Sequence, residues 1–112
     1  MSVVSGVVLI VSSCEENGET DTCTAWERAN AWLVERGYAA LARVERHASG
    51  TKHPQIWIGC AGLNHFRHRE DEFAAFVLGL DWVSMENVVL TIQPEEGDTR
   101  VWRSMVVPRV MT

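Results

Sequence analysis

An apolar run occupies residues 3–11: Val3-Val4-Ser5-Gly6-Val7-Val8-Leu9-Ile10-Val11. It is rich in β-branched residues and nearly continuous in hydrophobic character, which is typical of a central β-strand covered on at least one face. The remaining hydrophobic patterns follow it in the order helix, two strands, helix and a final pair of strands. A buried first strand followed by that order predicts a layered α+β domain.

Two segments have the spacing of amphipathic helices. The first covers residues 24–36, where Thr24 and Glu27 predict a capping box and Gly37 predicts the end of the helix. The second covers residues 70–80. The apolar positions that define the two helical stripes are Trp26, Ala29 and Leu33, then Phe73, Phe76, Val77 and Leu80.

Strands are predicted at residues 38–47, 55–61, 87–93 and 99–107, the last two joined by the turn at 94–98. The resulting order is β-α-β-β-α-β with an added C-terminal β-hairpin strand. This order resembles a ferredoxin-like two-layer sandwich, and we expect residues 1–112 to form a single α+β domain. That fold hosts many unrelated functions, so it predicts none by itself.

Composition restricts the partners of the chain. The formal net charge is -5, and Lys52 is the single lysine of the 112 residues. Nucleic-acid and anionic-membrane binding rely on clustered basic residues, so we expect no nucleic acid and no membrane as a partner. No stretch reaches the roughly 20 apolar residues that span a bilayer. The three cysteines form an odd set, which favours reduced thiols and therefore a cytoplasmic location. With its negative net charge, the chain is expected to be a soluble, acidic protein.

The segment Val11-Ser12-Ser13-Cys14 leaves an alternative open, because it resembles a bacterial lipoprotein cleavage box. No Lys or Arg precedes the apolar run, whereas a signal peptide normally begins with positive charge. We therefore favour the core strand. A disulfide between Cys14 and Cys23 also stays open.

One edge of the predicted sheet is a candidate ligand-binding site. Right-handed crossovers predict that the first and third strands are parallel neighbours, so their carboxyl ends should meet at one edge. The residues expected there are Ser13, Cys14, Asn64, His65 and His68.

Three kinds of chemistry are conceivable at that edge. Zinc would take Cys14, Cys60, His65 and His68, but no Cys-x-x-Cys pair supports a metal site. A thiolate at Cys14 or Cys23 would need His65 as its base, and no third residue orients that pair. An anion would bind near Asn64, Arg67 and Arg69, although a satisfied helix start explains these residues equally well. We assign no metal, no cofactor and no catalytic residue.

Tryptophan is unusually frequent, with five residues in 112. We place Trp57 and Trp102 on an open sheet face as an aromatic interface for a partner or a second subunit, since Trp is common in binding hot spots. The alternative is that the indoles pack between the helices and the sheet.

The sequence favours a small non-enzymatic protein-interaction domain that binds another protein or itself as a homodimer. The alternative is a small enzyme, or a ligand- or metal-binding domain, that uses the loop edge around Cys14, Cys60 and His65. The acidic segments 15–21 and 95–98 read as solvated surface, or as a negative face for a basic partner.

Overall fold

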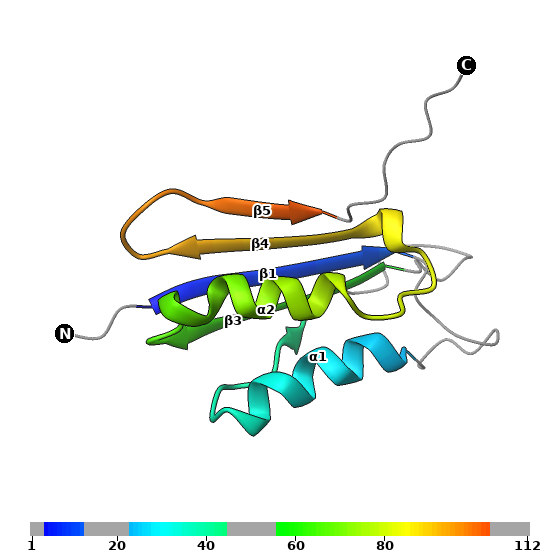
Figure 1. Ribbon diagram of the computed structural model, residues 1–112, viewed down its shortest axis with the longest axis horizontal. Coiled ribbons are helices and arrows are strands. Elements are labelled where there is room, and N and C mark those ends of the chain that lie inside the picture. Colours follow the sequence, from blue (N-terminus) through cyan, green and yellow to red (C-terminus); the bar gives the residue numbers. More distant parts are fainter. Residues whose placement is uncertain (1–3, 13–22, 45–55, 104–112) are drawn as a thin grey trace, which may run out of the picture.

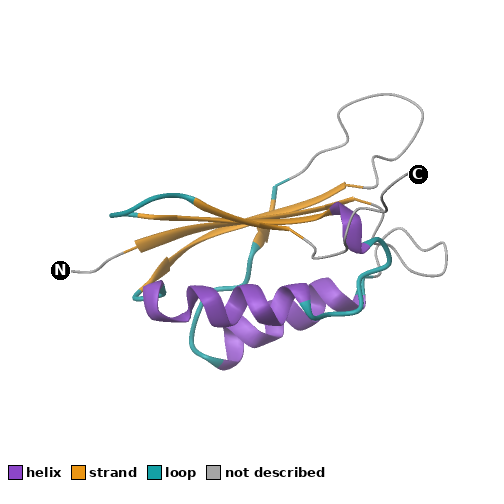
Figure 2. Ribbon diagram, turned by 45° about the horizontal axis from the view of Figure 1, so that its top comes forward, coloured by secondary structure: helices purple, strands orange, loops and turns teal. Residues whose placement is uncertain are grey.

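A computed structural model describes residues 4–12, 23–44 and 56–103 of the chain. The described residues form a small α+β structure with one antiparallel sheet of five strands and two α-helices. Both helices lie on the same face of the sheet (Figure 1 and Figure 2). The elements are β1 Val4–Ser12, α1 Thr24–Glu35, β2 Ala42–Arg43, β3 Ile56–Asn64, η1 Arg67–Arg69, α2 Glu70–Leu78, η2 Met85–Asn87, β4 Val88–Pro94 and β5 Arg100–Arg103.

The strands lie in the order β2-β3-β1-β4-β5, and every neighbouring pair is antiparallel. The first long strand, β1, is therefore central, as its continuous apolar character predicted. β3 is its neighbour, but the predicted parallel pairing is wrong. The crossover through α1 leads to β2, and β3 then turns back and enters between β2 and β1, so it runs opposite to β1.

The helix boundaries are close to the predicted ones, but the predicted capping box is wrong. α1 begins at Thr24 with Cys23 at the N-cap position, which makes no side-chain cap hydrogen bond. The end of α1 agrees with the sequence: Gly37 has a φ of 85°, and the Tyr38 amide donates to the Leu33 carbonyl over 2.9 Å. Glycine adopts this left-handed conformation without steric cost, which explains why the helix ends there.

The strand lengths differ more from the predictions. In the described part of the segment predicted as a strand over residues 38–47, Ala42 and Arg43 pair with β3, and the Val44 amide donates to the Ile58 carbonyl over 3.0 Å. β3 itself continues to Asn64. The parts of the predicted strands at 45–47, 55 and 104–107 lie outside the described residues.

The hydrophobic core lies between the sheet and the two helices. Alternate residues of β1 point into it, and Val7, Leu9 and Val11 are at most 1% exposed. The helices contribute Trp26, Ala29, Trp32 and Leu33 from α1 and Phe73, Ala74 and Val77 from α2. Among the described residues, no helix is long and apolar enough to cross a membrane.

Candidate functional site

The structure does not assemble the predicted site at the sheet edge. Because β3 is antiparallel to β1, Ser12 at the end of β1 lies opposite Ile56, whereas Asn64 lies opposite Val4 at the other end of the sheet. Ser13 and Cys14 lie outside the described residues. The parallel pairing of β1 and β3 on which this site depended is wrong, since the end of β1 at Ser12 and the end of β3 at Asn64 lie at opposite ends of the sheet.

The described members of that site are exposed residues at the end of β3 and in the turn that follows it. His65 has a φ of 56°, and its backbone carbonyl accepts a 3.3 Å hydrogen bond from the Tyr38 hydroxyl. His68 lies in the short η1 turn and is exposed, as is Asn64. These three residues remain close in sequence, but the structure gives them no shared buried pocket.

Cys60 lies in the middle of β3, four residues before Asn64, which corresponds to about 13 Å of extended chain. It carries a free thiol and is half-buried. Among the described residues, no group of three or more His, Cys, Asp or Glu side chains is arranged to hold a metal ion. Cys23, the other described cysteine, is 2% exposed at the start of α1.

The predicted aromatic interface is also wrong, because Trp57 and Trp102 lie on the helix side of the sheet. Trp57 is 5% exposed and packs edge-on against Trp26, with ring centroids 5.5 Å apart. Trp102 lies opposite the buried Leu90 and is half-buried against the core. A large indole gains most from the covered face, so Trp57 packs between α1 and the sheet, as in the alternative, while Trp102 is partly covered on the same side.

Arginine side chains cover the outer faces of these indoles. The guanidinium of Arg43 lies 3.6 Å from the centroid of Trp57, and that of Arg100 lies 4.6 Å from Trp102. These cation–π contacts stabilise the rings where they approach solvent. Trp57 and Trp102 therefore contribute to the stability of the fold on the helix side of the sheet. The other face of the sheet is formed by different residues.

That other face, which we call the open face, carries no described helix (Figure 2). The strand register places three rows of side chains across it. One row is Ala42, Cys60, Val8, Thr91 and Val101. The second is Ile58, Ile10, Val89 and Arg103, and the third is Gly62, Gly6 and Gln93. At the ends of the face lie Ile56 with Ser12, and Asn64 with Val4.

The open face is apolar and partly accessible. Val8, Ile10, Ile58 and Val89 are half-buried, and Val101 is 57% exposed. Isolated exposed aliphatic residues are normal, but a contiguous patch of them marks an interaction surface in most soluble proteins. This face is the strongest functional candidate in the described part of the chain.

A polar cluster lies on the helix side, where α2 begins. The Ser5 hydroxyl donates a 2.8 Å hydrogen bond to Glu70, which is 2% exposed, and Arg100 donates to the same carboxylate over 2.6 Å. Arg100 also donates to Asp71 over 2.9 Å. The hydrogen bond to Glu70 is the main reason why the pKa of Arg100 is raised above its ordinary value. These hydrogen bonds connect β1 and β5 to the first turn of α2, so we assign the cluster a structural role.

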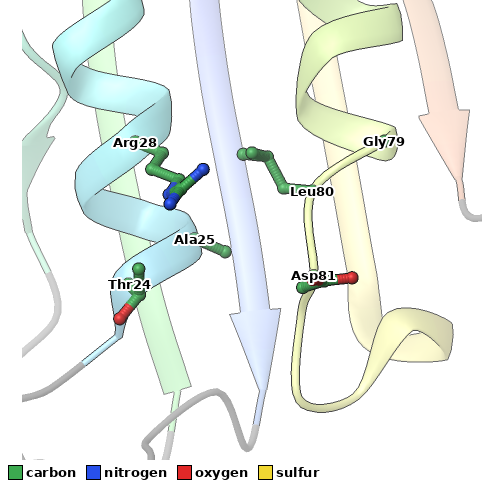
Figure 3. A pocket seen from close by; sticks show the side chains of 6 residues that line it. All are labelled: Thr24, Ala25, Arg28, Gly79, Leu80 and Asp81. Atoms are coloured by element: carbon green, nitrogen blue, oxygen red, sulfur yellow. The ribbon is translucent and has the colours of Figure 1, made fainter.

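A cavity of about 310 Å³ lies between the start of α1 and the loop after α2. Figure 3 shows Arg28 and Leu80 reaching into the gap between these elements, with Thr24 and Ala25 on the α1 side and Asp81 on the loop. The lining offers one guanidinium and one carboxylate on opposite walls. It holds no cysteine or histidine that would serve as a nucleophile or base, so it suggests no reaction.

Comparison with known proteins adds no family to this picture. No family model matches the chain, and neither the search of curated proteins nor the search of solved structures finds a match.

The two faces of β3 are the reverse of the prediction. The sequence placed Trp57 on the open sheet face, yet Trp57 and Gly59 lie on the buried side and Ile58 and Cys60 on the open side. Gly59 was the available signal: a Cβ atom there would lie 2.6 Å from Cζ2 of Trp26, so the Trp26 ring of α1 packs directly on the sheet backbone at this position.

Proposed function

We propose that this protein is a non-enzymatic protein-interaction domain that uses the open face to bind another protein chain. The observation that carries the proposal is the pair of aliphatic rows that cross a sheet face on which no described helix lies. Burying apolar surface contributes about 25 cal/mol per Å², so a partner on this face gains free energy that the isolated chain lacks.

The distribution of polar groups supports binding over catalysis. The described strand residues of the open face carry the free thiol of Cys60, the hydroxyls of Ser12 and Thr91, the amides of Asn64 and Gln93 and the guanidinium of Arg103, but no carboxylate and no histidine. A thiol without a neighbouring base or cation is a weak nucleophile. A largely aliphatic centre with polar groups at the ends of the face suits a protein interface, which has an apolar core and a polar rim.

The architectural assignment belongs to the same proposal. We propose a ferredoxin-like sandwich extended by β5. The chain order of helices and strands and the central position of β1 between β3 and β4 support it. The two-residue β2 is much shorter than the strand expected at that edge.

A cytoplasmic location is likewise proposed. The free thiol of Cys60 on an accessible face suits a reducing compartment.

The test compares two valines that are each 57% exposed: Val101 on the open face and Val34 on α1. Single chains at high dilution should bind an apolar fluorescent dye at the open face. Val101→Arg should weaken that dye fluorescence, whereas Val34→Arg should leave it unchanged. If single chains do not bind the dye, or if both variants bind it as the wild type does, the open face is not a docking surface.

A further inference from the structure

We infer that the occupant of the open face is a second copy of this chain, with the two sheets stacked face to face. The inference rests on the proposed function and makes it specific, because it names the partner. Three properties of the face support it: its size, its charge and the shape of its side chains.

The size of the face matches a small dimer interface. β1 and β3 each have nine residues, which at about 3.3 Å per residue gives a length of roughly 30 Å. Five strands about 4.8 Å apart give a width of roughly 24 Å. The other strands are shorter, because β2 has two residues, β4 seven and β5 four, so the flat footprint is on the order of 500 Å². This area is below the roughly 800 Å² that each partner buries in a standard interface, so it corresponds to a small, weakly associating dimer.

The charge of the open face favours a second copy of this chain as the partner over a strongly basic or acidic protein. The chain carries a formal net charge of -5, so two copies repel each other wherever their carboxylates meet. The described strand residues on the open face include no Asp or Glu, and Arg103 at one margin is their only charged side chain. Two acidic copies can therefore stack here without bringing carboxylates together, whereas a basic partner would find no complementary charge.

The side chains of the face suit sheet-on-sheet packing. Stacked sheets lie about 10 Å apart, and the side chains of their facing surfaces interdigitate. The central row is made of small and β-branched residues, Cys60, Val8 and Thr91, and Gly6 and Gly62 lie opposite each other beside it. In a two-fold symmetric contact between identical chains, each chain contributes the same patch. The open face alone can therefore form the whole interface.

The experiment measures the mass of the tag-free chain by sedimentation equilibrium over a range of concentrations. We expect a species of twice the chain mass. Val101→Arg should raise the dimer dissociation constant by at least about tenfold, because a symmetric contact buries the new charge twice. Val34→Arg should leave that constant unchanged. Thr91→Arg, at the centre of the face, should abolish the dimer, and circular dichroism checks that each variant is folded.

Alkylation of Cys60 supplies a second readout. In the wild-type dimer the Cys60 thiol should react at least about tenfold more slowly than in folded Thr91→Arg, because the partner sheet covers it. Equal Cys60 alkylation rates in the two proteins would overturn the inference, and so would a dimer that both Val101→Arg and Thr91→Arg leave intact.

The remaining outcomes separate this inference from the proposed function. A wild-type monomer that binds the apolar dye at the open face overturns self-association and leaves the face for a different protein. A wild-type monomer that binds no dye overturns both, because the face then offers no accessible apolar surface.

Discussion

The hydroxyl of Ser5 donates a 2.8 Å hydrogen bond to the carboxylate of Glu70, and both residues are at most 2% exposed. Ser5 interrupts the apolar run of β1, and Glu70 is the first residue of α2. The serine that weakens the hydrophobic pattern in the sequence is therefore the residue that satisfies a buried carboxylate. This contact joins the centre of the sheet to the helix layer.

Glu70→Gln should reduce the free energy of unfolding by about 1–3 kcal/mol, because the amide replaces a charged acceptor for the hydroxyl of Ser5 and the guanidinium of Arg100. Urea denaturation measures this change. Asp71→Asn is the matched control: Asp71 also accepts from Arg100, but its side chain is 81% exposed, so we expect a change below about 0.5 kcal/mol. Equal losses in the two variants would show that the burial of Glu70 is unimportant.

Gly59→Ala should destabilise the fold by about 1–3 kcal/mol, because the new methyl group collides with the buried Trp26 ring and with Cβ of Leu41. Gly62→Ala, on the same strand, is the control, since its Cβ would lie 3.4 Å from Val4 in ordinary contact. Thermal unfolding of the two variants should separate them by several degrees. A Gly59→Ala variant as stable as the wild type would mean that α1 does not approach the sheet here.

Trp57→Ala should lower the free energy of unfolding by about 3–5 kcal/mol, because it leaves a cavity beside Trp26 and removes the ring beneath Arg43. Chemical denaturation monitored by circular dichroism measures the loss. Trp102→Ala should cost less, since Trp102 is only half-buried. If Trp57→Ala dissociated a dimer without destabilising the monomer, the indole would belong to an interface after all.

His65→Gly should stabilise the protein by up to about 1 kcal/mol, because His65 has a φ of 56° and glycine adopts that conformation without strain. The hydrogen bond from Tyr38 reaches the backbone carbonyl, so it survives the substitution. Asn64→Gly, one residue earlier in β3, should instead destabilise by a few tenths of a kcal/mol. A thermal shift assay on both variants decides whether backbone strain is present at His65.

The sequence predicted the α+β class, the central position of β1 and the two helices, because each depends on local periodicity or on a strong end signal such as Gly37. It did not predict that β3 runs antiparallel to β1. The direction of β3 depends on its connection to β2, which it also pairs with in the antiparallel sense, and not on the hydrophobic pattern within β3. The candidate site failed for that reason: the predicted edge required parallel strands.

The assignment of faces in β3 failed for a different reason. Residues of β3 alternate between the two faces of the sheet as predicted. Ile56, Ile58 and Cys60 lie on one face, and Trp57 and Gly59 lie on the other. Hydrophobic content alone favours the first side. The decision depends on α1, because only a glycine leaves room for the Trp26 ring, and that contact joins residues from two distant segments.

The central position of β1 has a consequence for the biosynthesis of the protein. β1 leaves the ribosome before its two partners, and Leu9 pairs with Gly59 on one side and with Leu90 on the other. The backbone N–H and C=O groups along one edge of β1 therefore stay unpaired until β3 has been translated, and those along the other edge until β4 has been translated. The pairing then closes loops of large sequence separation, which slows folding. A nascent chain of this kind exposes an aggregation-prone strand during most of its synthesis, and chaperone binding to β1 would protect it over that period.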